Sequence, residues 1–274
     1  MLCGDLICYL EEYAPVELAE EWDNPGMQVG DLNQEVKKIM TALDATDSVI
    51  EQAIREGVDL IITHHPLLFK PLKRITEEDF IGKRIRKLIR NNISLYSMHT
   101  NCDIAKMADY SAFLLELEDT EPLGGIVKLP DTLSGGEFKN DRKLGIGKVG
   151  NLKEKLTLKG LCDKIKNRFN LNNIKVSGDM DAVIKRVAIC PGSGHDYIED
   201  ATAKKAQVLI TGDLGHHAVL DARERGLYLI DAGHFGTESF MKKQLADELM
   251  RNEKIRLDGI QIIMAEEEEP FHVM

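Results

Sequence analysis

The segment Asp59-Leu60-Ile61-Ile62-Thr63-His64-His65-Pro66 carries the strongest local signal for the fold class. Its first half is a short apolar run between polar residues, which is typical of a buried parallel β-strand. Its second half places two histidines and a proline where that strand ends. Pro66 favours an extended conformation for His65 and disfavours the start of a helix there. The segment therefore predicts a strand whose carboxyl end presents polar side chains.

The residues around this segment alternate between strand and helix patterns. A helix is expected before this segment: Asp47 is suited to cap its start, and Gly57 is suited to end it. The expected elements are, in order, strand 39–43, helix 48–56, strand 60–63, helix 81–90, strand 93–98 and helix 105–117. This alternation is typical of an α/β fold with parallel strand pairing.

The alternation returns in the second half of the chain. The expected elements there are helix 156–169, strand 174–177, strand 187–190, helix 197–206, strand 208–211, helix 218–225, strand 227–230 and helix 238–251. The runs 60–63 and 208–211 match at an offset of 148 residues. This match favours an internal duplication, although any two buried parallel strands resemble each other. We therefore expect an α/β protein with two similar α/β units that face each other.

The length of the chain favours more than one domain. Its 274 residues exceed the roughly 100–150 residues of a common domain. Glycine and proline pairs punctuate the middle of the sequence, as in a connection. We expect a first α/β unit over 1–120, a loop-rich connection over 121–145, and a second unit over 146–274. The C-terminal part of the second unit is free to pack back on the first.

Composition excludes several classes of protein. With 35 Lys and Arg against 46 Asp and Glu, the net charge is −11, which disfavours binding to duplex nucleic acid. No apolar stretch approaches the roughly 20 residues that span a bilayer, and the N-terminus lacks the basic region of a secretory signal. The five cysteines are odd in number and form no C-x-x-C motif. We expect a soluble protein of the reducing cytoplasm.

The histidines gather at one kind of position. Seven of the eight lie at or just after the carboxyl end of an expected strand: His64, His65, His99, His195, His216, His217 and His234. In open α/β sheets, ligands bind at that edge. The distribution therefore indicates a metal site or an acid–base site.

Two of these strand ends carry adjacent candidates. His64 and His65 can address two metal ions on either side of the chain, or they are a pair of surface histidines. Asp103 can supply an oxygen ligand, or it caps the helix that follows. His99 can act as a supporting group or in proton transfer.

A third strand end carries the segment Gly233-His234-Phe235-Gly236-Thr237-Glu238. His234 and Glu238 are four residues apart at the start of a helix, so they can share one face. A carboxylate can bridge two cations, although an acid here also complements the helix dipole. Three histidines and two carboxylates suit two divalent transition ions better than Ca²⁺.

Two further clusters of residues are candidates for the binding site. His216 and His217 follow Thr211-Gly212-Asp213, and we interpret them as a wall of the site, a supporting layer or a subunit contact. Pro191-Gly192-Ser193-Gly194-His195 is similar to a phosphate loop but matches neither common glycine motif, so a tight turn is favoured.

Five ordered motifs resemble the NIF-three-like family, whose members are commonly named GTP cyclohydrolase 1 type 2 homologs, in its compact bacterial form. The motifs are Glu21–Gly30, Ile62–Leu67, His99–Asp103, Thr211–Asp213 and Gly233–Glu238. The resemblance implies two similar α/β units across a metal-binding cleft and a toroidal homohexamer. It also implies that two divalent ions bind to His64, His65, Asp103, His234 and Glu238, with Glu238 as the bridge.

The resemblance and the residues together favour a dinuclear-metal-dependent hydrolase that acts on a nucleotide or a related small molecule. His99 is then the candidate acid or base, since it is left uncoordinated. The alternative is a non-enzymatic metal-binding ring or a regulatory scaffold, and nucleic-acid binding ranks third. Sites of this kind accept Zn, Mn, Fe, Co or Ni, which the sequence does not distinguish.

Overall fold

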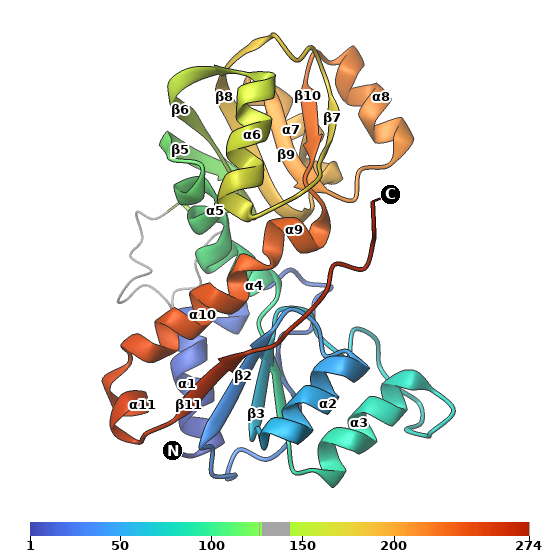
Figure 1. Ribbon diagram of the computed structural model, residues 1–274, viewed down its shortest axis with the longest axis vertical. Helices are drawn as coiled ribbons and strands as arrows, with labels where there is room; N and C mark the ends of the chain where they lie inside the picture. Colours follow the sequence, from blue (N-terminus) through green and yellow to red (C-terminus); the bar gives the residue numbers. More distant parts are fainter. Residues whose placement is uncertain (126, 128–142, 274) are drawn as a thin grey trace. The chain divides into compact units, whose positions relative to one another are not determined.

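The computed structural model describes residues 1–125, 127 and 143–273, and it divides the chain into two compact units. Unit 1 comprises residues 1–102 and 239–268, and unit 2 comprises residues 103–238 and 269–274. Each unit contains one β-sheet with helices packed against it (Figure 1). Residues 239–268 thus belong to unit 1, and residues 103–120 belong to unit 2.

The sheet of unit 1 has the strand order β1-β4-β3-β2-β11. The strands are β1 (Gly26–Val29), β2 (Lys38–Ala42), β3 (Leu60–Thr63), β4 (Ser94–Ser97) and β11 (Gln261–Met264). Only β1 is antiparallel to its neighbour; the other four run parallel. Every residue of β3 and β4 is buried, as expected for parallel strands covered on both faces. The expected strands 39–43, 60–63 and 93–98 are thus confirmed as β2, β3 and β4.

Helices cover both faces of this sheet. They are α1 (Cys3–Tyr13), α2 (Asp47–Glu56), α3 (Phe80–Arg90), α10 (Phe240–Arg251) and α11 (Glu253–Leu257), with the short turns η1 (Val16–Leu18) and α4 (Thr100–Cys102). Helices α2 and α3 lie on one face, and α1 and α10 lie on the other (Figure 1). Helix α2 begins where Thr46 Oγ1 accepts a hydrogen bond from the Val49 amide, and it ends at Gly57 with φ 65°.

The sheet of unit 2 has the strand order β5-β6-β8-β9-β10-β7. The strands are β5 (Leu117–Leu123), β6 (Gly147–Thr157), β7 (Lys175–Ser177), β8 (Val183–Ser193), β9 (Val208–Gly212) and β10 (Tyr228–Asp231). Strands β8, β9 and β10 are parallel, and the flanking strands are antiparallel. The helical segments are η2 (Asp103–Met107), α5 (Ala108–Leu114), α6 (Leu158–Phe169), η4 (His195–Tyr197), α7 (Ile198–Ala203), α8 (His216–Glu224) and α9 (His234–Glu238).

Residues 103–123 differ from the expectation of a helix over 105–117 followed by a loop. The chain forms the π-helical turn η2, then α5, and then the edge strand β5. Strand β5 is polar and largely exposed, and its pairing is irregular between Glu118 and Glu121. Because it lies at the edge of the sheet, its sequence lacks the alternation of apolar and polar residues that marks a half-buried strand. The other part of the expected connection, residues 126 and 128–142, lies outside the described residues.

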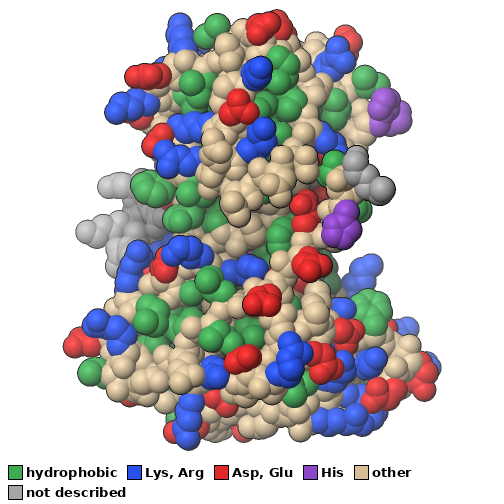
Figure 2. Space-filling model, in the orientation of Figure 1, with side chains coloured by type: hydrophobic (Ala, Val, Ile, Leu, Met, Phe, Trp, Pro, Cys, Tyr) green, Lys and Arg blue, Asp and Glu red, His purple; other side chains and the backbone are tan. Residues whose placement is uncertain are grey.

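The expected helix over 238–251 is also interrupted. The structure forms α9 up to Glu238 and α10 from Phe240, with the division between the two units at 238/239. Within the described part of the chain, no helix has both the length and the apolar character needed to cross a bilayer. Figure 2 shows acidic, basic and apolar side chains interspersed over the displayed face.

Candidate metal centre

The carboxyl end of β3 fixes the backbone of His64 and His65. The His64 amide donates to Ala42 O (3.2 Å), and the His65 amide donates to Leu43 O (3.0 Å). The pairing with the β2 side of the sheet therefore continues past Thr63, the last residue of β3. Thr63 Oγ1 also donates to the carbonyl of His65 (2.9 Å). Both histidines leave the strand with a defined backbone, as a binding site requires.

Three imidazoles of unit 1 form one cluster. The ring centroids of His64 and His65 are 4.9 Å apart, and the His99 ring lies 5.2 Å from the first and 5.4 Å from the second. One ring nitrogen from each residue lies within 4.8 Å of the other two. His64 is fully buried, whereas His65 and His99 are partly exposed. The cluster thus offers three nitrogen donors that are close enough to bind one ion.

Each of these rings is oriented through Nδ1. The acceptors are Met98 O for His64 (2.8 Å), Asp44 Oδ1 for His65 (3.0 Å) and Asp23 Oδ1 for His99 (2.7 Å). A carbonyl or carboxylate oxygen only accepts, so Nδ1 carries the proton and the lone pair of the neutral ring lies on Nε2. Metal-binding histidines commonly show this arrangement, because the outer partner fixes the tautomer and the ring orientation.

Asp23 is held in its charged form. Burial raises its pKa, but hydrogen bonds from His99, Thr100 and the Asn24 amide outweigh burial and lower the pKa to about 2. Thr100 donates both its amide (3.0 Å) and its hydroxyl (2.5 Å) to Asp23 Oδ2. The His99–Asp23 pair is therefore an oriented imidazole with a permanently ionised partner, the arrangement found beside many acid–base histidines.

Unit 2 presents a different donor set, at the end of β10. His234 and Glu238 lie on α9, where His234 Nε2 is 3.1 Å from Glu238 Oε2. On the other side of the ring, His234 Nδ1 donates to Asp213 Oδ2 (2.6 Å). Glu238 is almost completely buried. The His234 ring therefore lies between two carboxylates, and a cation at this place would be attracted by both.

Gly192 leaves room for the Glu238 carboxylate. A Cβ at position 192 would lie 2.2 Å from Glu238 Oε1, and the residue has φ +66°. The Gly192 amide donates to Thr237 Oγ1 (2.9 Å), which ties the end of β8 to α9. The segment 191–195 was expected to be a tight turn, but its first three residues continue β8 to Ser193. At Gly192 this segment leaves space for a buried carboxylate, and any side chain there would fill that space.

Asp103 adds a second buried carboxylate to unit 2. Its ligand oxygen lies within 4.8 Å of that of Glu238. Burial raises the pKa of the Cys190 thiol, and the charges of Asp103 and Glu238 raise it further. Asp103 begins the π-helical turn η2, and such turns are frequent at functional sites. Buried oxygen donors together with the Nε2 of His234 are chemically suited to a divalent transition ion.

The other histidines singled out from the sequence lie apart from these clusters. His195 is about half exposed and contacts Ser193 Oγ (3.2 Å) and Asp196 (3.3 Å). His216 and His217 begin α8, two residues before the expected start of that helix, and both are exposed. Among the described residues, none of the three belongs to a group of metal-ligating side chains.

Sequence reasoning missed the carboxylates that orient the rings, although Asp23 and Asp213 lay within quoted motifs. Asp44 follows β2 by two residues, and Asp213 directly follows β9. The rule that located the histidines, polar residues just after buried parallel strands, also applies to these two acids. Asp23 precedes β1, so only the folded chain brings it to His99.

Comparisons with known proteins agree with one another. The model of the family Duf34/NIF3 (NGG1p interacting factor 3) matches residues 1–270. A GTP cyclohydrolase 1 type 2 homolog of Clostridium acetobutylicum is 42% identical over 234 residues, covering 85% of this chain and 84% of the relative. A protein of the same name from Clostridium perfringens is 37% identical over 271 residues, covering 99% of each. The crystal structure of a Bacillus cereus protein related to NIF3 has a TM-score of 0.89 at 27% identity, covering 100% of this chain and 99% of that one.

Proposed function

The chain belongs to the Duf34/NIF3 family, and on that premise we propose that it is a dinuclear-metal-dependent hydrolase acting on a nucleotide or a related small molecule. The observation that carries the proposal is the anchoring of four imidazoles through Nδ1, three in unit 1 and His234 in unit 2. This arrangement presents Nε2 as a metal ligand in His64, His65 and His234, and as a proton-transfer atom in His99. Relatives named GTP cyclohydrolase 1 type 2 homolog support the assignment to nucleotide chemistry.

The proposed ligands are His64, His65, Asp103, His234 and Glu238, with Glu238 as the bridge between two ions. The connectivity of the chain supports this set of ligands. Asp103 is the first and Glu238 the last residue of the long segment of unit 2, so each is bonded directly to a residue of unit 1. A mixed nitrogen and oxygen set suits Zn, Mn, Fe, Co or Ni.

The chemistry of the proposed centre follows from its donors. When bound, divalent ions at such a site supply Lewis acidity and lower the pKa of water toward neutrality. Five protein ligands for two ions leave positions for substrate and water, as a catalytic site needs.

His99 is the proposed acid–base group. Asp23 holds its Nδ1–H, so Nε2 is the atom that takes a proton from water and returns it to the leaving group. The charge of Asp23 stabilises the imidazolium that forms on the way.

The test is metal analysis of the untagged protein, followed by incubation of the metal-loaded protein with a panel of nucleotides, nucleosides and simple esters. We expect about two ions per chain and turnover of a member of the panel. His99→Ala should keep both ions and the fold but lose about 10²–10⁴-fold in rate. Loss of metal in His99→Ala would make His99 a ligand instead.

The same experiment separates the enzyme from a metal-binding ring or scaffold. Two ions per chain without turnover of any compound in the panel would favour the scaffold. As part of the proposal we expect the protein to assemble as a homohexamer, which light scattering coupled to sizing measures directly. A monomer of 30.7 kDa at micromolar concentration would contradict that assembly.

A further inference from the structure

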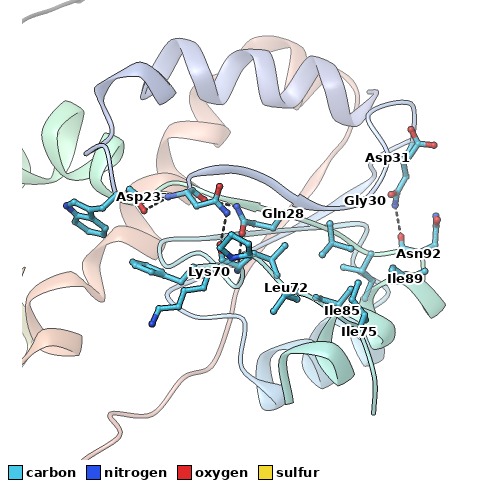
Figure 3. Close-up of a pocket in the computed structure, with 18 residues that line it drawn as sticks. Asp23, Gln28, Gly30, Asp31, Lys70, Leu72, Ile75, Ile85, Ile89 and Asn92 are labelled. Atoms are coloured by element: carbon cyan, nitrogen blue, oxygen red, sulfur yellow. Dashed lines mark hydrogen bonds between the residues drawn. The ribbon is translucent and has the colours of Figure 1, made fainter. Parts of the chain in front are cut away.

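Unit 1 contains a cavity that the proposed metal ligands do not line. Its volume is about 820 Å³, within the range of about 300–1,000 Å³ that is common for small-molecule pockets. Asp23 and Lys70 lie toward one end, Asp31 and Asn92 lie at the other, and Leu72 and Ile85 lie between them (Figure 3). The cavity therefore has the size and the apolar middle of a ligand site.

An exposed aromatic pair forms the end of the cavity near Asp23. The rings of Trp22 and Phe69 stack with centroids 5.7 Å apart and an angle of 29° between their planes. Trp22 is 58% exposed and Phe69 is 46% exposed, so neither ring is used to fill the core. Flat rings that remain open to solvent at a pocket are suited to stack against another planar ring.

The same pair leads to the imidazole cluster. The His99 ring packs edge-on against Trp22 at 5.8 Å and against Phe69 at 5.7 Å. His99 in turn contacts the rings of His64 and His65. A molecule stacked on the aromatic pair is thereby brought beside the proposed acid–base group.

The loop that carries Phe69 is held in place by amide side chains. Asn24 Nδ2 donates to Leu68 O (2.6 Å), and the Leu68 amide donates to Gln28 Oε1 (3.1 Å). These two side chains are therefore occupied with fixing the wall. The aromatic surface is preorganised, which lowers the entropic cost of binding a rigid ring.

Basic residues lie in the loop next to the aromatic pair: Lys70, Lys73 and Arg74 follow Phe69. The acid at this end of the cavity is Asp23, and its two oxygens accept hydrogen bonds from His99 and Thr100. Lys70 lines the cavity. A local cation at this end favours an anionic group on the ligand.

We infer that this cavity binds a planar aromatic ring carrying an anionic group, such as a purine nucleotide, with the ring against Trp22 and Phe69 and the anion toward Lys70. This inference deepens the proposed function, on which the role of His99 rests, by assigning the substrate-binding residues. Binding itself requires no metal, so it is testable separately.

Trp22 is the only tryptophan of the chain, so tryptophan fluorescence reports directly on this cavity. The whole 274-residue chain, freed of metal with a chelator, is titrated with GMP, guanosine and ribose 5-phosphate. GMP should quench the emission saturably, guanosine should quench with lower affinity, and ribose 5-phosphate should not quench. Phe69→Ala should weaken GMP binding about tenfold or more, because stacking on one aromatic ring contributes that much.

Two further variants sharpen the test. Lys70→Gln should weaken binding of GMP several-fold and leave guanosine unchanged. Phe113→Ala removes a 72% exposed aromatic side chain of unit 2 and should change neither affinity. All three positions are exposed, so the variants are expected to fold.

Several outcomes would overturn the inference. One is the absence of saturable quenching, and another is equal affinity in wild type and Phe69→Ala. A Trp22 emission that shifts on dilution of the protein alone would mean that a second copy covers the cavity. GMP binding without turnover would support this inference and contradict the hydrolase proposal. Turnover without a change in Trp22 emission would support the hydrolase proposal and contradict this inference.

Discussion

Unit 1 and unit 2 both contain three neighbouring parallel strands in the same order, but different side chains follow those strands. In unit 1 the strands are β2, β3 and β4; His64 and His65 follow β3, and His99 follows β4. In unit 2 they are β8, β9 and β10; Asp213 follows β9, and His234 follows β10. The same backbone arrangement thus carries a nitrogen-rich donor set in one unit and an oxygen-rich set in the other.

This difference separates the residues that fill the core from the residues that can bind a ligand. The strand interiors, such as Leu60–Thr63 and Val208–Thr211, are buried on both faces and need only to fill the core. The first residues past the strand ends are free of that requirement, so polar donors occur there. Comparing substitutions between the two units therefore tests whether both donor sets serve one function.

The largest expected effect is loss of metal on removal of the proposed bridging carboxylate. If Glu238 serves both ions as proposed, Glu238→Ala should lower the metal content from about two ions per chain to well below one. His65→Ala, which removes a ligand from the imidazole cluster, should lower both the metal content and the activity. Plasma mass spectrometry of the purified proteins measures the metal content.

The control for Glu238→Ala is Glu224→Ala, which removes an exposed carboxylate at the end of α8 and should keep the wild-type content. One ion per chain in the wild type, unchanged in Glu238→Ala, would contradict the dinuclear proposal.

The next effect concerns the space around Glu238. Gly192→Ala places a Cβ against Glu238 Oε1, so it should displace the carboxylate and lose most of the bound metal. Gly226→Ala is the matched control, since Gly226 also has positive φ (+76°), but a Cβ there would meet no side chain or backbone of another described segment within 4 Å. Equal metal content in the two variants would mean that the space around Glu238 does not matter.

A smaller effect is expected from the carboxylates that orient the histidines. Asp44→Asn in unit 1 and Asp213→Asn in unit 2 should each lower metal affinity about 10–100-fold, as outer partners of metal-binding histidines commonly do. Competition with a chromogenic chelator measures the affinity. If only one of the two variants has an effect, the units do not contribute alike, and the proposal of one shared centre is weakened.

The smallest effect concerns the pH dependence of stability in unit 1. The pKa of Asp23 is lowered to about 2 in the folded protein, from about 3.9 in an unfolded chain. The charged carboxylate therefore stabilises the fold at pH values above the unfolded pKa. The difference in unfolding free energy between wild type and Asp23→Asn should be on the order of 2 kcal/mol at pH 6. It should shrink as the pH falls from about 5 toward 2.

Urea unfolding of both proteins at several pH values measures this difference. A difference that stays constant over the acidic range would mean that the charge of Asp23 adds nothing to stability.

The elements that sequence reasoning predicted best are the buried parallel strands. Strands β2, β3, β4, β8, β9 and β10 carry local apolar runs, and histidines follow β3, β4, β8 and β10 within three residues. Both signals lie within a few neighbouring residues, so they do not depend on the rest of the fold.

Edge strands and long-range hydrogen bonds were not predictable in this way. Strand β11 is a four-residue, partly exposed run at the end of the chain, and only its pairing with β2 makes it a strand. Strand β5 contains Pro122 and acidic residues, which edge strands tolerate because one side makes no ladder hydrogen bonds.

By itself, the sequence determined the α/β class and the histidines at the strand ends, because burial and strand ends leave local patterns. Only the tertiary structure decided which acid orients each ring and which glycine makes room for a carboxylate. Asp23 and His99 are 76 residues apart, yet they are hydrogen-bonded. Gly192 and Glu238 are 46 residues apart, yet a side chain at position 192 would collide with the Glu238 carboxylate. Such contacts depend on the packing of whole elements, which leaves no periodic signal along the chain.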